Sequence, residues 1–171
     1  MRDLFPVLRV LGMLMCMFAL AMALPGAVSW WQQESVWRVY PLSMAVTMGA
    51  GLPLWWLLRH HRQELQPRHG VILVTLVWVL LPLAASLPLW LAMAQVARPI
   101  SFTHAYFEAV SGLTTTGSTV LSGLDALPLS VNIWRTFLQW MGGMGILILA
   151  VAVLPLLGVG GSQLFKAEAA G

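Results

Sequence analysis

Residues 114–118, which read TTTGS, are the stretch of the sequence whose residue types best suggest chemistry. An extended strand whose carbonyl oxygens all point one way can replace the hydration shell of a monovalent cation. Gly117 supplies backbone angles that other residues resist, and the threonine hydroxyls add oxygen ligands without charge. Full charge is not needed, because a conducted ion must bind weakly enough to leave. The stretch therefore suggests cation coordination by neutral oxygens.

A short helix is expected directly before this stretch. Apolar residues recur at helical spacing there, at Phe102, Tyr106, Phe107, Val110 and Leu113. The pattern predicts about three turns, which Gly112 and the threonines terminate. Such a helix is too short to cross a bilayer, and residues 97–131 as a whole are too polar to do so alone. We predict a re-entrant loop, in which the partly negative end of the helix points towards the ion path.

The composition indicates an integral membrane protein. Of 171 residues, 59% are hydrophobic and 9% are charged, whereas roughly a quarter are charged in a soluble domain. Mean hydropathy is +0.82. Each span needs about 20 apolar residues, and four segments qualify: 4–28, 39–58, 70–96 and a fourth from residue 132 to about residue 155.

The predicted fold class is therefore an all-α membrane protein with two parts. An N-terminal transmembrane helix pair and its cytoplasmic loop occupy residues 1–69, and a module of span, pore helix, filter loop and span occupies residues 70–171. Because no nucleophile-and-base motif or phosphate-binding glycine loop appears, an enzyme is not expected. The net charge of +3 sits mainly in short connections, which indicates membrane topology rather than nucleic-acid binding.

Segment 4–28 is longer than the apolar region of a signal peptide, about 7 to 15 residues, and is interpreted as a retained helix. The alternative is a cleavable signal, which Arg2 and the small residues Ala21 and Ala23 imitate.

Basic residues set the expected orientation. The loop between the second and third spans should be cytoplasmic because it carries Arg59, Arg62 and Arg68. Both termini then also face the cytoplasm, in agreement with Arg9 and Lys166. Tryptophans near the predicted span ends fit interfacial positions, namely Trp30, Trp31, Trp37, Trp55, Trp56, Trp90 and Trp134.

Three longer segments, FEAVSGLTTTGSTVL, GLDALP and WRTFLQWMGGMGILILAVAVLPLLGVGG, resemble the first pore repeat of the Trk/Ktr/HKT potassium transporter superfamily. The likeness is greatest to the membrane subunit of bacterial Trk potassium uptake systems, whose extra N-terminal helix pair the first two spans resemble. Family members carry four such repeats, and this sequence contains one. We expect a truncated N-terminal part of a longer subunit that conducts little by itself. The alternative is four copies assembled around an axis.

The resemblance implies potassium transport across a bacterial inner membrane, with filter carbonyls from Thr115, Thr116, Gly117 and Ser118. A potassium ion would bind at the first three, as substrate and with no covalent cofactor. Gly117 would be the selectivity glycine, since sodium-favouring members of the plant branch have serine there. The implied partners are the remaining pore repeats or other copies of the chain, a cytoplasmic nucleotide-binding regulatory subunit and the lipid bilayer, and not nucleic acid.

Four residues near the filter are candidates for its entrance or support: Thr114, Glu108, Asp125 and Arg135. Glu108 could concentrate cations or pair with Arg135, and pairing is the favoured interpretation. Asp125 could attract potassium at the outer mouth, or be a solvated turn acid.

Three glycines of the last span, Gly142, Gly143 and Gly145, could form a gate or hinge, or could mark close helix packing. His60, His61, Glu64 and His69 suggest a metal site, but the neighbouring arginines would repel a cation, so a solvated loop is expected. The alternative function is a structural or interaction membrane protein in which TTTGS is an ordinary turn. An ion-binding site would respond differently to potassium and sodium, and a packing segment would not.

Overall fold

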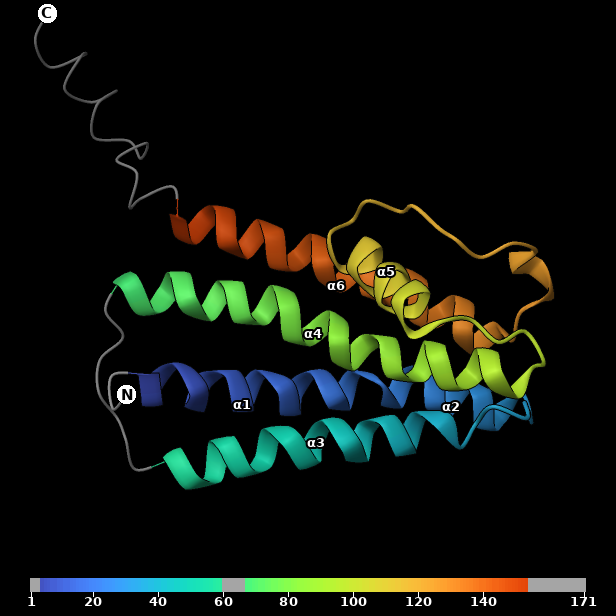
Figure 1. Cartoon of the computed structure of the whole chain (residues 1–171), viewed down its shortest axis with the longest axis horizontal. Coiled ribbons are helices and arrows are strands. Elements are labelled where there is room, and N and C mark those ends of the chain that lie inside the picture. The colour runs from blue at the N-terminus through green and yellow to red at the C-terminus, as the bar shows by residue number, and fades with distance from the viewer. Residues whose placement is uncertain (1–3, 60–66, 154–171) are drawn as a thin grey trace, which may run out of the picture.

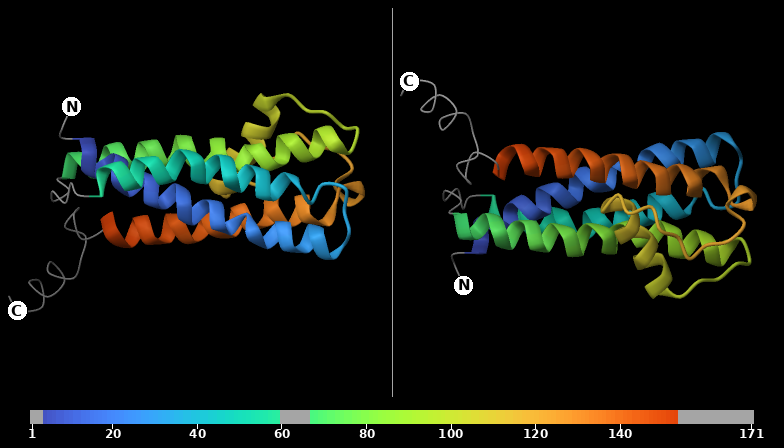
Figure 2. Two further views of the ribbon diagram at one scale, coloured as in Figure 1. Left: turned by 90° about the horizontal axis from the view of Figure 1, so that it is seen from below. Right: turned by 90° about the horizontal axis from the view of Figure 1, so that it is seen from above.

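A computed structural model describes residues 4–59 and 67–153, which form a helical bundle (Figure 1). The elements in chain order are α1 (Phe5–Ala21), α2 (Ala23–Trp31), α3 (Val39–Leu58), α4 (Pro67–Gln95), α5 (Phe102–Leu113), the 3-10 turn η2 (Leu124–Ala126) and α6 (Leu129–Val153). The long helices lie roughly parallel in all views (Figures 1 and 2). The predicted all-α class is confirmed.

Three helical stretches of the described chain are long and apolar enough to cross a membrane: Phe5–Trp31, Val39–Leu58 and His69–Gln95. The fourth predicted span corresponds to α6, which has 25 residues and begins three residues earlier than expected, at Leu129. That α6 crosses the membrane stays a prediction. The chain is a multi-pass membrane protein.

The first predicted span is not one uninterrupted helix. It is divided at Met22 into α1 and α2, and it continues to Trp31. Pro25 has no backbone N–H, so it cannot donate to the carbonyl of Ala21, four residues earlier. At the end of α1 the Met22 amide donates to the Ala19 carbonyl at 3.1 Å. This bond spans three residues, so the turn is tighter than an α-helical turn. The helix is therefore interrupted within the span.

Both ends of the described chain lie at the same end of the bundle. The start of α1, the end of α3, the start of α4 and the end of α6 are together there, and the α2–α3 connection and η2 lie at the opposite end (Figure 1). This is the relative arrangement that the predicted topology requires. That this end is cytoplasmic stays a prediction, and Arg62 and Lys166 lie outside the described residues.

The N-terminal helices pack closely on each other and on the remaining helices. A Cβ at Gly12 of α1 would lie 2.7 Å from the carbonyl oxygen of Gly51 in α3, so these two backbones touch. Phe18 of α1 packs on Trp134 of α6, with 5.8 Å between ring centroids. The division at residues 69 and 70 stays a prediction, but the two parts share one hydrophobic core.

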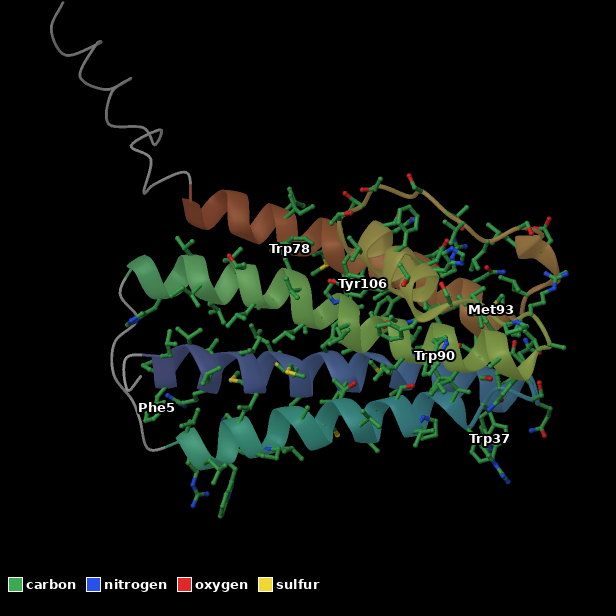
Figure 3. All side chains as sticks on the ribbon, viewed as in Figure 1. Phe5, Trp37, Trp78, Trp90, Met93 and Tyr106 are labelled. Carbon is green, nitrogen blue, oxygen red and sulfur yellow. The ribbon has the colours of Figure 1, made fainter. Side chains whose placement is uncertain are left out.

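Helix α4 continues through Pro82 and Pro88, and two side chains donate to its backbone near these positions. The Tyr106 hydroxyl of α5 donates to the Val79 carbonyl at 3.3 Å, where α5 lies against α4 (Figure 3). The Trp134 indole N–H donates to the Ala85 carbonyl at 3.0 Å. Both acceptors lie three residues before a proline, where the ring distorts the helix. Neighbouring helices thus supply donors to the distorted backbone.

The interfacial assignment of Trp134 was wrong. Its side chain is completely buried among α1, α4 and α6. The other six tryptophans named above are exposed and lie near helix ends, as predicted. Trp134 lies one turn into α6, on the side that faces the core, so nearness to a span end did not reveal its burial.

Replacing Trp134 with phenylalanine should lower the free energy of unfolding in detergent by about 1–2 kcal/mol, because a buried carbonyl loses its donor while most of the apolar volume is kept. Trp140→Phe is the matched control, since Trp140 lies on the same helix and is exposed. Equal losses in the two variants would contradict a role for the indole hydrogen bond.

Candidate functional site

Helix α5 begins where Ser101 caps its N-terminus. The Ser101 hydroxyl oxygen accepts a hydrogen bond from the His104 amide at 3.2 Å, as capping serines do. The 12-residue helix runs inward from the end of the bundle that holds η2, and the chain then returns to that end (Figures 1 and 2). This is the predicted re-entrant course, and Leu113 is the last residue of α5, as the spacing predicts.

The backbone amides of the TTTGS segment are hydrogen-bonded to the end of α5. The four amides of residues 114–117 all donate to carbonyl oxygens of residues 110–112, at 2.8 to 3.3 Å. These carbonyls belong to the last turn of α5, which has no helical donors of its own. The backbone amides of residues 114–117 are therefore all used in hydrogen bonds to α5.

Most carbonyl oxygens of the same segment accept no hydrogen bond from the described residues. In the part of the chain that the structure describes, no donor reaches the carbonyl oxygens of Thr115, Thr116 and Gly117. The Ser118 carbonyl differs, because it accepts a hydrogen bond from the Ser111 hydroxyl at 2.7 Å. Of the four predicted filter carbonyls, three are free to coordinate and the fourth already has a donor.

Two residues of the segment have left-handed backbone angles. Gly117 has φ +73°, which costs a glycine little, and Thr115 has φ +59°, which is unusual for a β-branched residue. Such strain persists only where surrounding contacts impose it, and it gathers at functional sites. Here the hydrogen bonds from the backbone amides to the carbonyls of α5 hold these two residues in the left-handed conformation.

Helix α6 packs against the end of α5 and against this segment, and we call this packing surface of α6 the filter backing. A Cβ at Gly142 would lie 2.0 Å from the Leu113 carbonyl oxygen, so α6 touches the backbone at the end of α5. A Cβ at Gly143 would lie 3.8 Å from the Thr115 methyl group, and one at Gly145 would meet nothing within 4 Å. The close-packing interpretation thus holds for Gly142, whereas a hinge role of Gly143 and Gly145 stays a prediction.

Glu108 connects α5, the chain leaving the segment and α6. Its side chain is 2% exposed, and its Oε2 accepts a hydrogen bond from Arg135 Nε at 2.9 Å. Its Oε1 accepts from the Thr119 hydroxyl and from the Val120 amide, both at 2.6 Å. The predicted pairing of Glu108 with Arg135 is confirmed. The pair leaves neither charge of Glu108 and Arg135 uncompensated.

The remaining candidates lie further from this centre. The Thr114 hydroxyl donates to the Val110 carbonyl at 2.8 Å, which makes Thr114 a support of the segment. Asp125 is exposed on η2 and fits a solvated turn acid, and its attraction for cations stays a prediction. Among the described residues no group of three metal-ligating side chains occurs, and His60, His61 and Glu64 lie outside them.

Sequence reasoning missed one residue that the structure brings to the site, Gln139, and one that contacts the start of α6, Glu34. The Gln139 side-chain nitrogen lies 3.6 Å from where a Cβ of Gly117 would be. Its spacing of four from Arg135 could have placed it on the same face of the last span. Glu34, in the α2–α3 connection, contacts the start of α6. No periodic pattern marks a lone acid in a polar connection, so no sequence signal identified it.

Known proteins resemble this chain over most of its length. The sequence matches the TrkH family, described as a cation transport protein, over residues 40–171. The Trk system potassium uptake protein TrkH of Halomonas elongata is 44% identical over 165 residues, which cover 96% of this chain and 34% of that protein. The same-named protein of Escherichia coli K12 is 41% identical with the same coverage. The chain thus spans about a third of their length.

A solved structure shares the fold. The crystal structure of the potassium transporter TrkH from Vibrio parahaemolyticus matches with a TM-score of 0.81 and 37% sequence identity, over 99% of this chain and 35% of that chain. The predicted resemblance to this family is therefore confirmed, and the proteins that the chain matches are named as transport proteins. This chain belongs to the TrkH family of cation transport proteins.

Proposed function

We propose that this chain supplies one quarter of a potassium-conducting pore. The observation that carries the proposal is the division of the TTTGS backbone, whose amides bind α5 while the carbonyls of residues 115–117 have no donor. A ring of such carbonyls can replace potassium's hydration shell. Potassium is the proposed ion because the similar proteins are named potassium uptake proteins.

Four strands are needed to surround an ion, so three further segments complete the pore. We propose that they come from further repeats of the same protein, since its relatives are about three times as long as this chain. The exposure of residues 115–120 supports this, because the face of the segment away from α5 and α6 is open to receive neighbouring strands.

The charge arrangement suits conduction. The carboxylate nearest the segment, Glu108, is paired with Arg135, so no net charge stands behind the carbonyls. A potassium ion would be held by neutral oxygens alone, which permits both binding and release. Asp125, exposed on η2, would add only a weak attraction at the outer mouth.

The proposal also covers the location of the protein, its orientation and its partner. The protein would lie in a bacterial inner membrane with both termini in the cytoplasm, and a cytoplasmic nucleotide-binding subunit would regulate it. The names of the relatives, which refer to Trk systems, support a multi-component assembly. Gly145, which has open space beside it, and Gly143, where a Cβ would make only an ordinary contact, would allow α6 to bend during gating.

The test is Gly117→Ser in the protein expressed from its complete reading frame, in cells without other potassium uptake. Wild type should take up rubidium, a potassium analogue, with little competition from sodium. The variant should lose about tenfold or more in potassium-over-sodium preference, equal to ~1.4 kcal/mol, because a side chain at φ +73° must displace the carbonyls.

Gly123→Ser is the matched control, since Gly123 also has a left-handed backbone, φ +61°, but lies beyond the segment. It carries the same backbone strain and should keep wild-type ion preference. If both variants retain the preference, or both lose it equally, residues 115–117 do not select the ion and the proposal is wrong.

A further inference from the structure

The N-terminal helices contact the pore module through Glu34, in the connection between α2 and α3. Its Oε1 accepts a hydrogen bond from the Ser130 amide at 3.2 Å, and its Oε2 accepts one from the Ser130 hydroxyl. Ser130 is the second residue of α6 and is completely buried. The two residues are 96 positions apart in the sequence.

The chemistry of this contact is that of a helix cap supplied from elsewhere in the chain. The first amides of a helix have no helical acceptor, and the helix dipole attracts a carboxylate to them. A buried amide without an acceptor would be costly. Glu34 satisfies the Ser130 amide, and its charge stabilises the start of α6.

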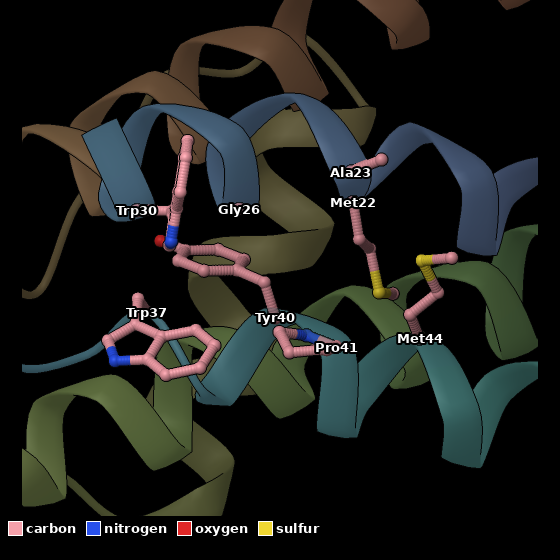
Figure 4. Close-up of a pocket in the computed structure, with 8 residues that line it drawn as sticks. All are labelled: Met22, Ala23, Gly26, Trp30, Trp37, Tyr40, Pro41 and Met44. Atoms are coloured by element: carbon pink, nitrogen blue, oxygen red, sulfur yellow. The ribbon is translucent and has the colours of Figure 1, made fainter.

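The carboxylate is held in a defined place. The Glu34 amide donates to the Ser29 carbonyl at 3.0 Å, and the Glu34 carbonyl accepts from the Trp37 amide at 3.4 Å. Tyr40 of α3, which is buried, lies close to Ser130. Figure 4 shows Tyr40 extending from α3 to α2 beside Gly26, where packing fixes its ring. The N-terminal helices thus present a preorganised acceptor.

From Ser130 onward, successive turns of α6 contact the pore. Arg135 pairs with Glu108, Gln139 lies beside Gly117, and Gly142 touches Leu113. A helix transmits a shift of its first turn to the turns that follow, because its backbone hydrogen bonds make it stiff. The position of the filter backing therefore depends on where α6 begins.

We propose that Glu34 is a positioning residue for ion selection: it acts through α6 to hold the filter, and it does not itself bind the ion. The inference rests on the proposed function of residues 115–117. It assigns to the N-terminal helix pair, which lies outside the pore repeat, a part in the selectivity of the pore.

The test uses Glu34→Ala, Ser130→Ala and their double variant in the full protein, with rubidium uptake measured against competing sodium. Each single variant should weaken the potassium-over-sodium preference by about threefold or more, as expected for loss of a hydrogen bond to a charged group. The double variant should be no worse than the more affected single variant. Glu34→Gln, which keeps an acceptor for the Ser130 amide, should restore at least half of the preference.

Gln32→Ala is the control, since Gln32 lies exposed in the same connection. If Glu34→Ala does not accumulate in the membrane, Ser130→Ala tests the hydroxyl part of the contact, since it keeps the amide donor to Glu34 and removes the hydroxyl donor. Wild-type preference in both Glu34→Ala and Ser130→Ala, or additive losses in the double variant, would overturn the inference alone. A wild-type protein without potassium preference would instead overturn the proposed function.

Discussion

Gly142→Ala is expected to abolish uptake and to lower the free energy of unfolding by about 3 kcal/mol, the upper range for overpacking a core. The added Cβ would lie 2.0 Å from the Leu113 carbonyl oxygen, and all three of its nearest neighbours are backbone atoms. Backbone cannot rotate aside as a flexible side chain can. Helices α5 and α6 must separate, and residues 115–117 lose their backing. Thermal unfolding of the purified protein and rubidium uptake measure the two effects.

Gly143→Ala is the matched control, one residue away on the same helix. Its added methyl group would make only an ordinary contact, 3.8 Å from the Thr115 methyl group. Both variants change helix propensity by the same amount, so a difference between them reports packing alone. Equal behaviour of the two variants would show that α6 does not touch the end of α5 as described.

Glu108→Ala should cost about 3–5 kcal/mol of stability, since removing one partner of a buried ion pair leaves the other charge uncompensated. It also removes the acceptor of the Thr119 hydroxyl and the Val120 amide. The chain leaving the filter should then become mobile. The expected results are a lower unfolding temperature in detergent and loss of the potassium-over-sodium preference in whatever protein reaches the membrane.

Removing the Arg135 charge as well separates the cost of an unpaired charge from the cost of the lost hydrogen bonds to Glu108. Glu108→Ala combined with Arg135→Met should be more stable than Glu108→Ala alone, because no unpaired guanidinium remains. Ion preference should stay poor in this double variant, since the Val120 amide still lacks its acceptor. Stability losses that simply add would argue against the pair.

The sequence predicted those features that depend on local composition. Apolar runs with charged or polar ends gave the bounds of α3, and helical spacing from Phe102 to Leu113 gave those of α5. The pairing of Glu108 with Arg135 followed from the scarcity of charge in apolar surroundings, where two opposite charges are stable only together.

Features that depend on which helix faces which were not predictable. Gly142 and Gly143 are equivalent in sequence, and only the position of α5 separates a glycine that touches backbone from one that does not. Trp134 was misplaced for the same reason, since its burial depends on α1 and α4 packing against it. The interruption at Met22 did have a local cause, Pro25, whose effect on the preceding turn was not weighed.

The unpaired carbonyls of residues 115–117 also bear on how such a protein is made. In hydrocarbon each orphaned polar group costs several kcal/mol, so this segment is unfavourable at membrane depth until neighbouring strands and ions arrive. In the proposed pore, this repeat would therefore stay hydrated or be shielded by the insertion machinery until its neighbours are made. If the proposed ring of four segments is not completed, the expected product is a poorly inserted intermediate, open to proteolysis, rather than a leaky channel.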